Sequence, residues 1–326
     1  MGPAHAAGGI RDGGQDMNVL MLGAGATGGY FGGRLLEAGR DVTFLVREHR
    51  AAQLRGNGLV IRSPHGDLRL KPRVLLSGHV HATFDLVILG CKAWDLESAM
   101  SAIAPAVGPA TTVLPLLNGL RHFEALDARF GAARVLRGLC SIAVHLGSDG
   151  AIEHLSSLHA LRFGEADDRR TPRIEALDTL MAGCRFDGRS SAGIRQALWE
   201  KWVMLASLAA MNCLLRASVG EIVATPEGRA LMLETCDECS AIAAAHGHPL
   251  RPSVAEGVRA LLTEPGSRAK ASMLRDLEQG GRVEADHILG DLIARGAAHG
   301  LAAPLLRAAH ASLKIHEQTL KKPLRH

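Results

Sequence analysis

A glycine-rich run near the N-terminus has the spacing of a dinucleotide-binding turn. The apolar run Val19–Leu22 leads directly into G-x-G-x-x-G. In such a turn the first glycine permits a tight bend, the second lets the backbone approach a pyrophosphate, and the third lets the next helix pack on the sheet. Because a strand precedes the run and a helix and a second strand follow it, we favour cofactor binding over a merely Gly-rich loop. The candidate cofactor-binding residues are Gly23, Ala24, Gly25, Ala26, Thr27 and Gly28.

The residue after the second predicted strand distinguishes the two nicotinamide cofactors. An Asp or Glu there bonds the ribose 2′-hydroxyl of NAD, whereas an Arg accommodates the 2′-phosphate of NADP. The strand Asp41–Val46 is followed at once by Arg47, which is suited to a charge-assisted contact with that phosphate. The alternatives are Glu48 as an NAD ligand and Arg47 as an ordinary solvated residue. We favour NADP(H).

Two further polar residues follow predicted strands. Lys92 comes after the strand Asp85–Gly90, and Asn118-Gly119 comes after the strand Thr111–Leu117. Doubly wound sheets bind ligands at the carboxyl ends of their strands, so both residues are candidates for a site. Taken alone, each also fits a surface lysine or an ordinary Asn-Gly turn.

One C-x-x-C pair needs a separate interpretation. Cys236 and Cys239 are followed by His246 and His248, a set that resembles zinc ligands. No second Cys pair exists, however, and the pair lies in an Ala- and Glu-rich stretch typical of a helix. We interpret the two residues as packed helix cysteines and expect no metal site. Six cysteines in a long chain without an export signal indicate reduced thiols and a cytoplasmic protein.

These residues require a scaffold of alternating strands and helices. The predicted strands of the first half are Asn18–Leu22, Asp41–Val46, Asp85–Gly90, Thr111–Leu117 and Val135–Val144, and helical patterns cover Thr27–Ala38 and Trp94–Ala104. Alternation of this kind indicates a parallel sheet. After Pro172 the β signal fades and Ala/Leu/Glu/Arg-rich helical stretches follow. We therefore predict an α/β Rossmann-type N-terminal domain and an all-α C-terminal domain.

The predicted boundaries divide the chain into three parts. Residues 1–16 are read as a disordered leader or a misplaced start, residues 17–185 as the NADP-binding Rossmann domain, and residues 190–326 as the helical substrate and catalytic domain. The opening residues contain no apolar core of a secretory signal.

Composition excludes several classes of protein. The 326 residues are 47% hydrophobic and 21% charged, which suits about two globular domains and not a disordered chain. The longest apolar stretch, Val203–Leu215, is interrupted by Ser207 and Asn212 and is shorter than the ~18 residues of a membrane span. A net charge of +4 without a run of like charges, and few aromatic residues, argue against nucleic-acid binding.

Together the motifs resemble those of ketopantoate reductases (2-dehydropantoate 2-reductases). The resemblance covers nearly the whole chain from Met17, and its blocks occur in the family's order. Besides the glycine run, Arg47, Lys92-Ala-Trp and Asn118-Gly119, they are Leu198–Lys201, Ala271–Asp276, Val283–Gly290, His299-Gly300 and Pro304.

The resemblance implies roles for individual residues. Lys201 would be the general acid that protonates the ketone oxygen, and Glu284 would bind the substrate hydroxyl and orient the reacting group. Ser272 would contact the substrate carboxylate. Lys92 and Asn118 would lie along the nicotinamide and substrate cleft. An ammonium group suits the first role, because hydride addition builds negative charge on the carbonyl oxygen.

The chain departs from the family at one helix face. The family usually has asparagines four and eight residues after the catalytic lysine, where this chain has Leu205 and Ala209. Asn212 returns to nearly the same face but lies about 16 Å from Lys201 along the axis, too far to share a small substrate. Loss of two amides should weaken binding of a polar substrate or favour a more apolar one. Alternatively, other residues or waters replace the amides.

Three hypotheses follow for the function. The first is NADPH-dependent reduction of ketopantoate to pantoate. The second is the same chemistry on a more apolar 2-keto acid or carbonyl compound, and the third is a non-catalytic NADP(H)-binding sensor. Retention of Lys201, Ser272 and Glu284 weighs against the sensor. The expected partner is a small 2-keto acid, with no nucleic acid and no membrane, and a homodimer is left open.

Overall fold

The chain divides into two compact units. The computed structural model describes residues 17–321, so the predicted leader 1–16 lies outside the described residues. The sheet unit runs through Cys91 and also contains Glu97–Leu116 and Leu126–Ile194. The helical unit contains Lys92–Leu96, Leu117–Ala125 and the chain from Arg195 onward.

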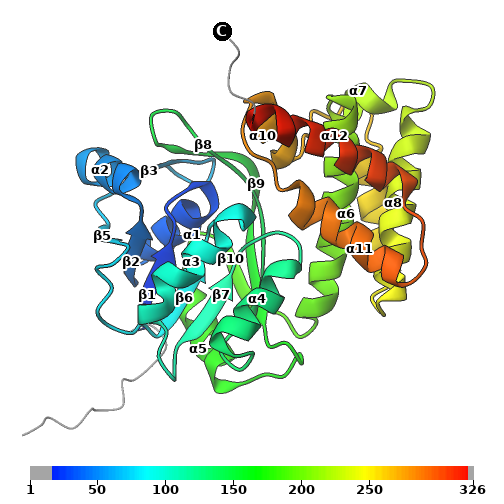
Figure 1. Cartoon of the computed structure of the whole chain (residues 1–326). Helices are drawn as coiled ribbons and strands as arrows, with labels where there is room; N and C mark the ends of the chain where they lie inside the picture. Colours follow the sequence, from blue (N-terminus) through cyan, green and yellow to red (C-terminus); the bar gives the residue numbers. More distant parts are fainter. Residues whose placement is uncertain (1–16, 322–326) are drawn as a thin grey trace, which may run out of the picture. The chain divides into compact units, whose positions relative to one another are not determined.

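A five-stranded parallel sheet forms the centre of the sheet unit (Figure 1). Its strand order is β5-β2-β1-β6-β7, and every neighbouring pair is parallel. The strands are β1 (Asn18–Leu22), β2 (Asp41–Val46), β5 (Arg73–Leu76), β6 (Leu86–Leu89) and β7 (Thr112–Pro115). Four of them agree with the predicted strands to within two residues. This confirms the Rossmann-type N-terminal fold.

Helices follow four of these strands, and a fifth helix comes later in the chain. They are α1 (Ala26–Glu37), α2 (Glu48–Asn57), α3 (Leu96–Ile103), α4 (Arg121–Phe130) and α5 (Pro172–Met181), with short 3-10 turns at Ala93–Asp95 and Ala104–Ala106. Helix α1 packs its face with Tyr30, Phe31 and Leu35 into the core, where all three are fully buried. It ends before Gly39, whose φ of +78° is the left-handed conformation that commonly terminates a helix.

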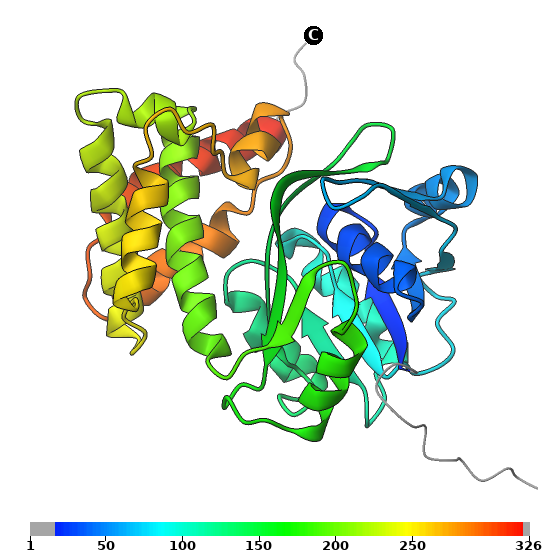
Figure 2. The ribbon, with the colours of Figure 1, turned by 180° about the vertical axis from the view of Figure 1, so that it is seen from behind.

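A second sheet belongs to the same unit and was not predicted. It contains β3 (Leu59–Arg62), β4 (Leu68–Leu70), β8 (Arg137–Leu146), β9 (Ile152–Gly164) and β10 (Asp187–Ser190). The prediction that Val135–Val144 continues the parallel sheet is wrong for most of that segment. Only Val135 forms a single parallel bridge to β7, and β8 then pairs antiparallel with β9. The two long green strands run side by side in Figure 2.

The β8–β9 pair contains a large irregularity. Ile142 pairs with His159 and Val144 pairs with His154, so two steps along β8 correspond to five along β9. The extra residues of β9 bulge out of the ladder, and Leu155 and Leu158 are 53% and 56% exposed there. A β-bulge of this kind redirects side chains relative to a regular strand.

The helical unit is built around one long apolar helix, α6 (Ile194–Leu215). After Lys201, helix α6 is apolar on nearly all sides, as expected of a helix surrounded by others. Its neighbours are α7 (Val219–Val223), α8 (Gly228–Ala245), α9 (Pro252–Leu262), α10 (Ser272–Glu278), a π-helical turn (Asp286–Gly290), α11 (Asp291–Ala298) and α12 (Pro304–Lys321). This confirms the all-α C-terminal fold.

The two polar residues that interrupt the apolar run of α6 have internal partners. The Ser207 hydroxyl donates to the Val203 carbonyl oxygen at 2.8 Å. The fully buried Asn212 accepts from the Ala271 N–H at 2.8 Å and donates to the Ala217 carbonyl oxygen at 2.8 Å. Asn212 therefore fastens the segment that precedes α10 to α6.

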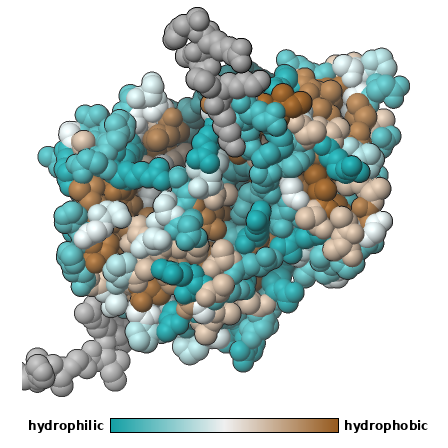
Figure 3. Space-filling model, viewed as in Figure 1, coloured by the Kyte–Doolittle hydropathy of each residue, from teal (hydrophilic) through white to brown (hydrophobic). Residues whose placement is uncertain are grey.

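Two observations bear on whether the described residues include a membrane span. On the face drawn in Figure 3, hydrophobic residues are scattered among hydrophilic ones. Within residues 17–321, no helix combines the length and the apolar character needed to cross a bilayer.

Candidate functional site

The glycine turn of the sheet unit has the geometry that its sequence predicts. Gly23 has a φ of +89°, which favours glycine. A Cβ on Gly28 would lie 2.4 Å from the Gly23 carbonyl oxygen and 3.4 Å from the Gly90 Cα, so only glycine allows α1 to start this close to the sheet. At Gly25, the N-cap of α1, a Cβ would meet nothing within 4 Å.

This turn fits a dinucleotide pyrophosphate. The open space at Gly25 lies beside the first backbone N–H groups of α1, which are unpaired within the helix and carry the positive end of its dipole. Ala26 and Thr27 open that helix, and Ala24 is buried at 1% exposure.

Arg47 occupies the predicted place at the end of β2. It is exposed and forms the N-cap of α2. Glu48, the alternative NAD ligand, lies in the first turn of α2 with its carboxylate 3.7 Å from the Arg55 guanidinium. Glu48 thus has a cationic neighbour along its own helix.

Arg50 is a second arginine close to the glycine turn, and sequence analysis missed it. Its Nε donates to the Ala24 carbonyl oxygen at 2.8 Å, and its Nη1 donates to the Gly150 carbonyl oxygen at 2.9 Å. Among the residues that the structure describes, none is a hydrogen-bond partner of the buried Nη2. Burial lowers the pKa of Arg50 below its ordinary value, which still leaves an arginine charged. Its place in the sequence, one turn after Arg47, carried no recognisable signal.

The helical unit brings Lys92 and Glu284 together. The Lys92 Nζ lies 2.8 Å from Asp276 Oδ2 and 3.6 Å from Glu284 Oε2. The other carboxylate oxygen of Glu284 accepts from the Ala93 N–H at 2.9 Å. Only 10% of the Glu284 side chain is exposed. The glutamate is therefore held in one orientation by two neighbours from the segment after β6.

The charge state of Lys92 follows from these contacts. Burial alone would lower the pKa of Lys92, but the negative charges of Glu284 and Asp276 outweigh burial and raise it. Lys92 is thus a permanent cation and is poorly suited to donate a proton near neutral pH.

Asn118 connects Lys201 with the segment that carries Glu284. The Lys201 Nζ donates to Asn118 Oδ1 at 2.9 Å. The Asn118 backbone carbonyl lies 2.8 Å from His287 Nε2, which must be the donor because a carbonyl oxygen only accepts. Lys201, Asn118 and His287 form one hydrogen-bonded chain across α6, the segment after β7 and the π-helical turn.

Burial favours the neutral form of His287. Burial lowers its pKa, and the nearby Glu284 charge and the bond to Asn118 only partly oppose that effect. The turn that bears it is π-helical, a local form often found at functional sites. The Ile288 carbonyl of this turn accepts from the Trp202 indole N–H at 3.0 Å, which ties the turn to α6.

Ser272 and Asp276 lie one turn apart on α10. Ser272 is the first residue of the helix and is exposed, and Asp276 contacts Lys92. Residues four apart share a helix face, so Ser272 lies on the side of α10 that meets Lys92. Asn212 supports this arrangement through its bond to the Ala271 N–H.

The two positions that depart from the family pattern differ in burial. Leu205, one turn after Lys201, is partly exposed. Ala209 is only 4% exposed and belongs to the core of the helical unit. Only Leu205 therefore presents an aliphatic surface beside Lys201.

A cleft of about 750 Å³ in the helical unit reaches Glu284 and His287. Cations from three segments line it: Arg121, Arg282 and Lys314. Trp94 also contributes, with the Arg282 guanidinium 5.1 Å from its ring centroid. Lys201 and Ser272 are not among the lining residues.

The C-x-x-C pair lies inside the helical core. Cys236 and Cys239 are on α8, at 2% and 0% exposure, and burial raises the pKa of both thiols. His246 stacks on Trp199 with ring centroids 5.1 Å apart, and His248 lies 3.1 Å from the Gln196 side chain.

Two residues of the helical unit contact the predicted site residues but were not themselves predicted. Asp276 and His287 stand within the motif blocks but received no role there. Asp276 is four residues after Ser272, and His287 is three residues after Glu284, so helical spacing places each on the same face as a predicted site residue. This spacing does not show which other residues that face contacts.

Comparison with known families identifies two matching regions. Residues 19–168 match the family described as "Ketopantoate reductase PanE/ApbA", and residues 193–317 match "Ketopantoate reductase PanE/ApbA C terminal".

Individual relatives agree with these matches. The chain is 38% identical over 301 residues to the uncharacterized oxidoreductase YkpB of Bacillus subtilis, covering 92% of this chain and 99% of that protein. It is 28% identical to 2-dehydropantoate 2-reductase of Halobacterium salinarum, covering 89% and 96%. The crystal structure of 2-dehydropantoate 2-reductase from Geobacter metallireducens matches with a TM-score of 0.84 and 30% identity, covering 92% and 99%.

Proposed function

This chain belongs to the ketopantoate reductase family and is an oxidoreductase, and on that premise we propose that it reduces a 2-keto acid to a 2-hydroxy acid with NADPH. Ketopantoate is the first candidate substrate. The observation that carries the proposal is the contact between Lys201 Nζ and Asn118 Oδ1 in the same unit as Glu284 and Lys92.

The residues of the sheet unit suit the cofactor. The turn Gly23–Gly28 accommodates the pyrophosphate, because a Cβ is excluded at Gly28 and space is open at Gly25. Arg47 supplies a cation for the 2′-phosphate. Arg50, with an unpartnered buried Nη2 beside Ala24, supplies a second positive charge for the phosphates. When bound, NADPH supplies the hydride.

Lys201 donates the proton in this proposal. As the ketone carbon becomes tetrahedral, its oxygen gains negative charge, and a proton from the Lys201 ammonium converts that oxygen to a hydroxyl. Asn118 accepts one of the three N–H groups of Lys201 and so fixes the direction of the others. His287 in turn fixes Asn118 through its backbone carbonyl.

Glu284, Lys92 and Ser272 bind the substrate in this proposal. Glu284 accepts from a substrate hydroxyl, and the Lys92 ammonium lies 3.6 Å from the Glu284 carboxylate and helps to hold it in place. The Ser272 hydroxyl, exposed at the start of α10, donates to the substrate carboxylate.

A reductase of a more apolar 2-keto acid is the second candidate. Leu205 supports it, because this partly exposed aliphatic side chain lies one turn from Lys201, where the family usually has an amide.

Rates of NADPH oxidation over a panel of 2-keto acids test the proposal. The informative pair is ketopantoate and trimethylpyruvate, which differ by one hydroxyl group. Faster reduction of ketopantoate supports the first candidate, and faster reduction of trimethylpyruvate supports the second. NADPH binding without turnover of any 2-keto acid would instead identify a sensor.

Lys201→Ala tests the proton donor. We expect turnover to fall by roughly 10²–10⁴ with NADPH affinity nearly unchanged, since a positioned general acid has about that effect. The control is Lys71→Ala, which removes an exposed lysine of the sheet unit and should leave turnover unaltered. Near-normal turnover in Lys201→Ala would show that another group donates the proton.

A further inference from the structure

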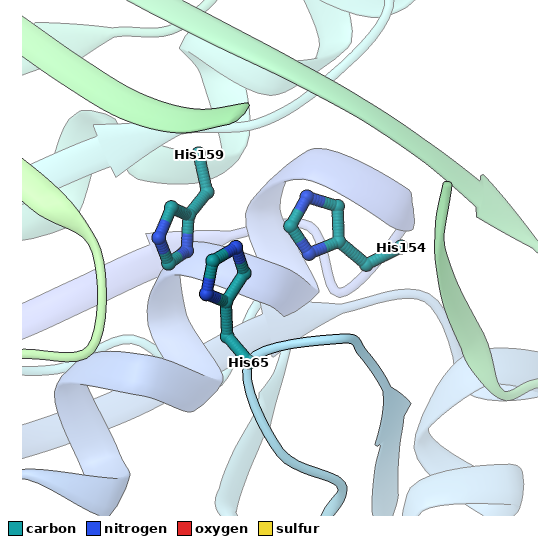
Figure 4. Close-up of side chains that lie close together, drawn as sticks. All are labelled: His65, His154 and His159. Carbon is teal, nitrogen blue, oxygen red and sulfur yellow. The ribbon is translucent and has the colours of Figure 1, made fainter. Parts of the chain in front are cut away.

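Three histidines of the sheet unit point toward one another, although the proposed reaction uses none of them (Figure 4). His65 lies in the loop between β3 and β4, and His154 and His159 lie on β9. One ring nitrogen from each lies within 4.8 Å of those of the other two. The rings of His65 and His159 stack with centroids 3.7 Å apart, and both lie 5.6 Å from the ring of His154.

The bulge in β9 creates this cluster. Residues five apart on a regular strand point to opposite faces. Here His154 and His159 pair with Val144 and Ile142, which are two residues apart, so both histidines lie on one face of the sheet. Without the extra residues of the bulge, the two rings could not meet.

The bulge also supplies hydrogen-bond acceptors for the rings. His65 Nε2 lies 2.8 Å from the Ser157 carbonyl oxygen, and His154 Nε2 lies 3.2 Å from the Leu158 carbonyl oxygen. A carbonyl only accepts, so both Nε2 atoms carry the proton. The Nδ1 atoms of His65 and His154 therefore keep their lone pairs.

Two hydroxyl groups contact the Nδ1 atoms of His154 and His159, and each can change its hydrogen bonding by rotation. The Ser63 hydroxyl lies 2.9 Å from His154 Nδ1, and it can rotate away. The Tyr30 hydroxyl lies 2.7 Å from His159 Nδ1 and can either donate or accept. Metal-binding histidines characteristically have such outer partners, which fix the ring tautomer and orientation.

We propose that His65, His154 and His159 bind one zinc ion. Imidazole nitrogens suit zinc, copper and nickel and do not suit magnesium or calcium. Tetrahedral zinc with bonds of 2.0–2.1 Å requires nitrogens about 3.4 Å apart. To face one ion, the rings of His65 and His159 must turn out of their stacked arrangement, in which their planes differ by 13°. His154 is 6% exposed and forms the base of the site, whereas His65 and His159 are partly exposed and leave access from solvent.

The surrounding charges permit a cation. Arg34 is fully buried nearby and donates to the Gly66 carbonyl oxygen at 2.6 Å. Its charge is balanced by Glu37, 2.9 Å away. The ion would fasten the β3–β4 loop to the bulge of β9, which is a structural role separate from the reductase activity.

Zinc binding to the full chain after chelator treatment tests the proposal. We expect calorimetry to show one zinc ion per chain and the melting temperature to rise when zinc is added. His65→Gln changes a loop residue and should weaken zinc binding about 10-fold or more. The control is His81→Gln, which removes an exposed histidine of the same unit and should not alter the affinity. Equal zinc affinity in both variants and the wild type would overturn the proposal, as would no binding at all.

Cobalt substitution of the wild-type protein provides a second measurement that does not depend on the folding of a variant. Imidazole ligands give tetrahedral cobalt bands in the visible region without thiolate charge-transfer bands in the near ultraviolet. Strong charge-transfer bands would assign the ion to cysteines, such as Cys236 and Cys239, and would refute the histidine site.

Discussion

Leu205→Asn is expected to shift substrate preference toward ketopantoate, whereas Ala209→Asn is expected mainly to destabilise the protein. Leu205 is partly exposed beside Lys201, so an amide there can hydrogen-bond a substrate hydroxyl. One such bond contributes about 0.5–1.5 kcal/mol. The ratio of kcat/KM for ketopantoate to that for trimethylpyruvate should therefore rise about 2- to 13-fold.

Burial sets the opposite expectation for Ala209. Ala209 is 4% exposed in the core of the helical unit. A larger amide there lowers the free energy of unfolding by about 1–3 kcal/mol through overpacking and by about 1–3 kcal/mol through its unpaired polar group. Leu205→Asn loses only part of a leucine's burial energy, about 1 kcal/mol. Thermal melting should therefore show a several-fold larger loss of stability in Ala209→Asn.

Initial rates with the two substrates, measured beside melting curves, separate these effects. The control is Leu215→Asn, which changes an exposed leucine at the far end of α6 from Lys201 and should leave the substrate ratio unchanged. A stable Leu205→Asn protein with an unchanged ratio would refute the placement of this residue beside the substrate. Efficient reduction of ketopantoate by the wild type would show that the missing amides are dispensable.

Three other predictions concern cofactor, substrate and acid stability. Arg47→Ala should raise the dissociation constant of NADPH about 10- to 100-fold and that of NADH far less, because a charge-assisted phosphate contact contributes roughly 1.5–3 kcal/mol; equal losses in a binding titration would contradict its role. Glu284→Ala should raise KM and lower kcat together, and a change in only one of them would argue against a combined binding and orienting role. At Glu165, burial raises the pKa, but the Arg173 and Thr171 contacts outweigh burial and lower it below 4.5. The stabilisation by these contacts is thus present above pH 4.5 and is lost as the pH falls through the folded-state pKa of Glu165. The difference in melting temperature between the wild type and Glu165→Gln should therefore narrow below pH 4.5. A difference that stays constant with pH would contradict this role of Glu165.

Four strands of the parallel sheet were predictable because burial on both faces makes them continuous apolar runs. The fifth, β5, was not predicted, and its residues are exposed or only partly buried. Strand β10 was also not predicted, since Asp187–Ser190 is polar and its strand form depends on tertiary contacts, which are the pairing with β9 and the bonds from Ser190 to Asp178. The antiparallel path of β8 was missed for a related reason. An apolar segment shows that it is buried, but not which strand it pairs with.

The candidate site shows the same division. Lys92 and Asn118 were found because strand ends gather at one edge of a sheet. Asp276 was not found, because it contacts Lys92 across 184 residues of sequence. The histidine cluster depends on a bulge whose residues, Leu155–Leu158, have no distinctive sequence pattern.

The interleaved path of the chain limits how this protein can be divided by protein engineers. The helical unit contains two short insertions from the first half of the sequence, Lys92–Leu96 and Leu117–Ala125. A fragment beginning at Arg195 would keep Lys201 and Glu284 but would lack Lys92 and Asn118. In a chimera that exchanged only the C-terminal halves of two relatives, Lys92 and Asn118 would come from one protein, and the residues they contact would come from the other. Grafts between relatives should therefore transfer three segments together.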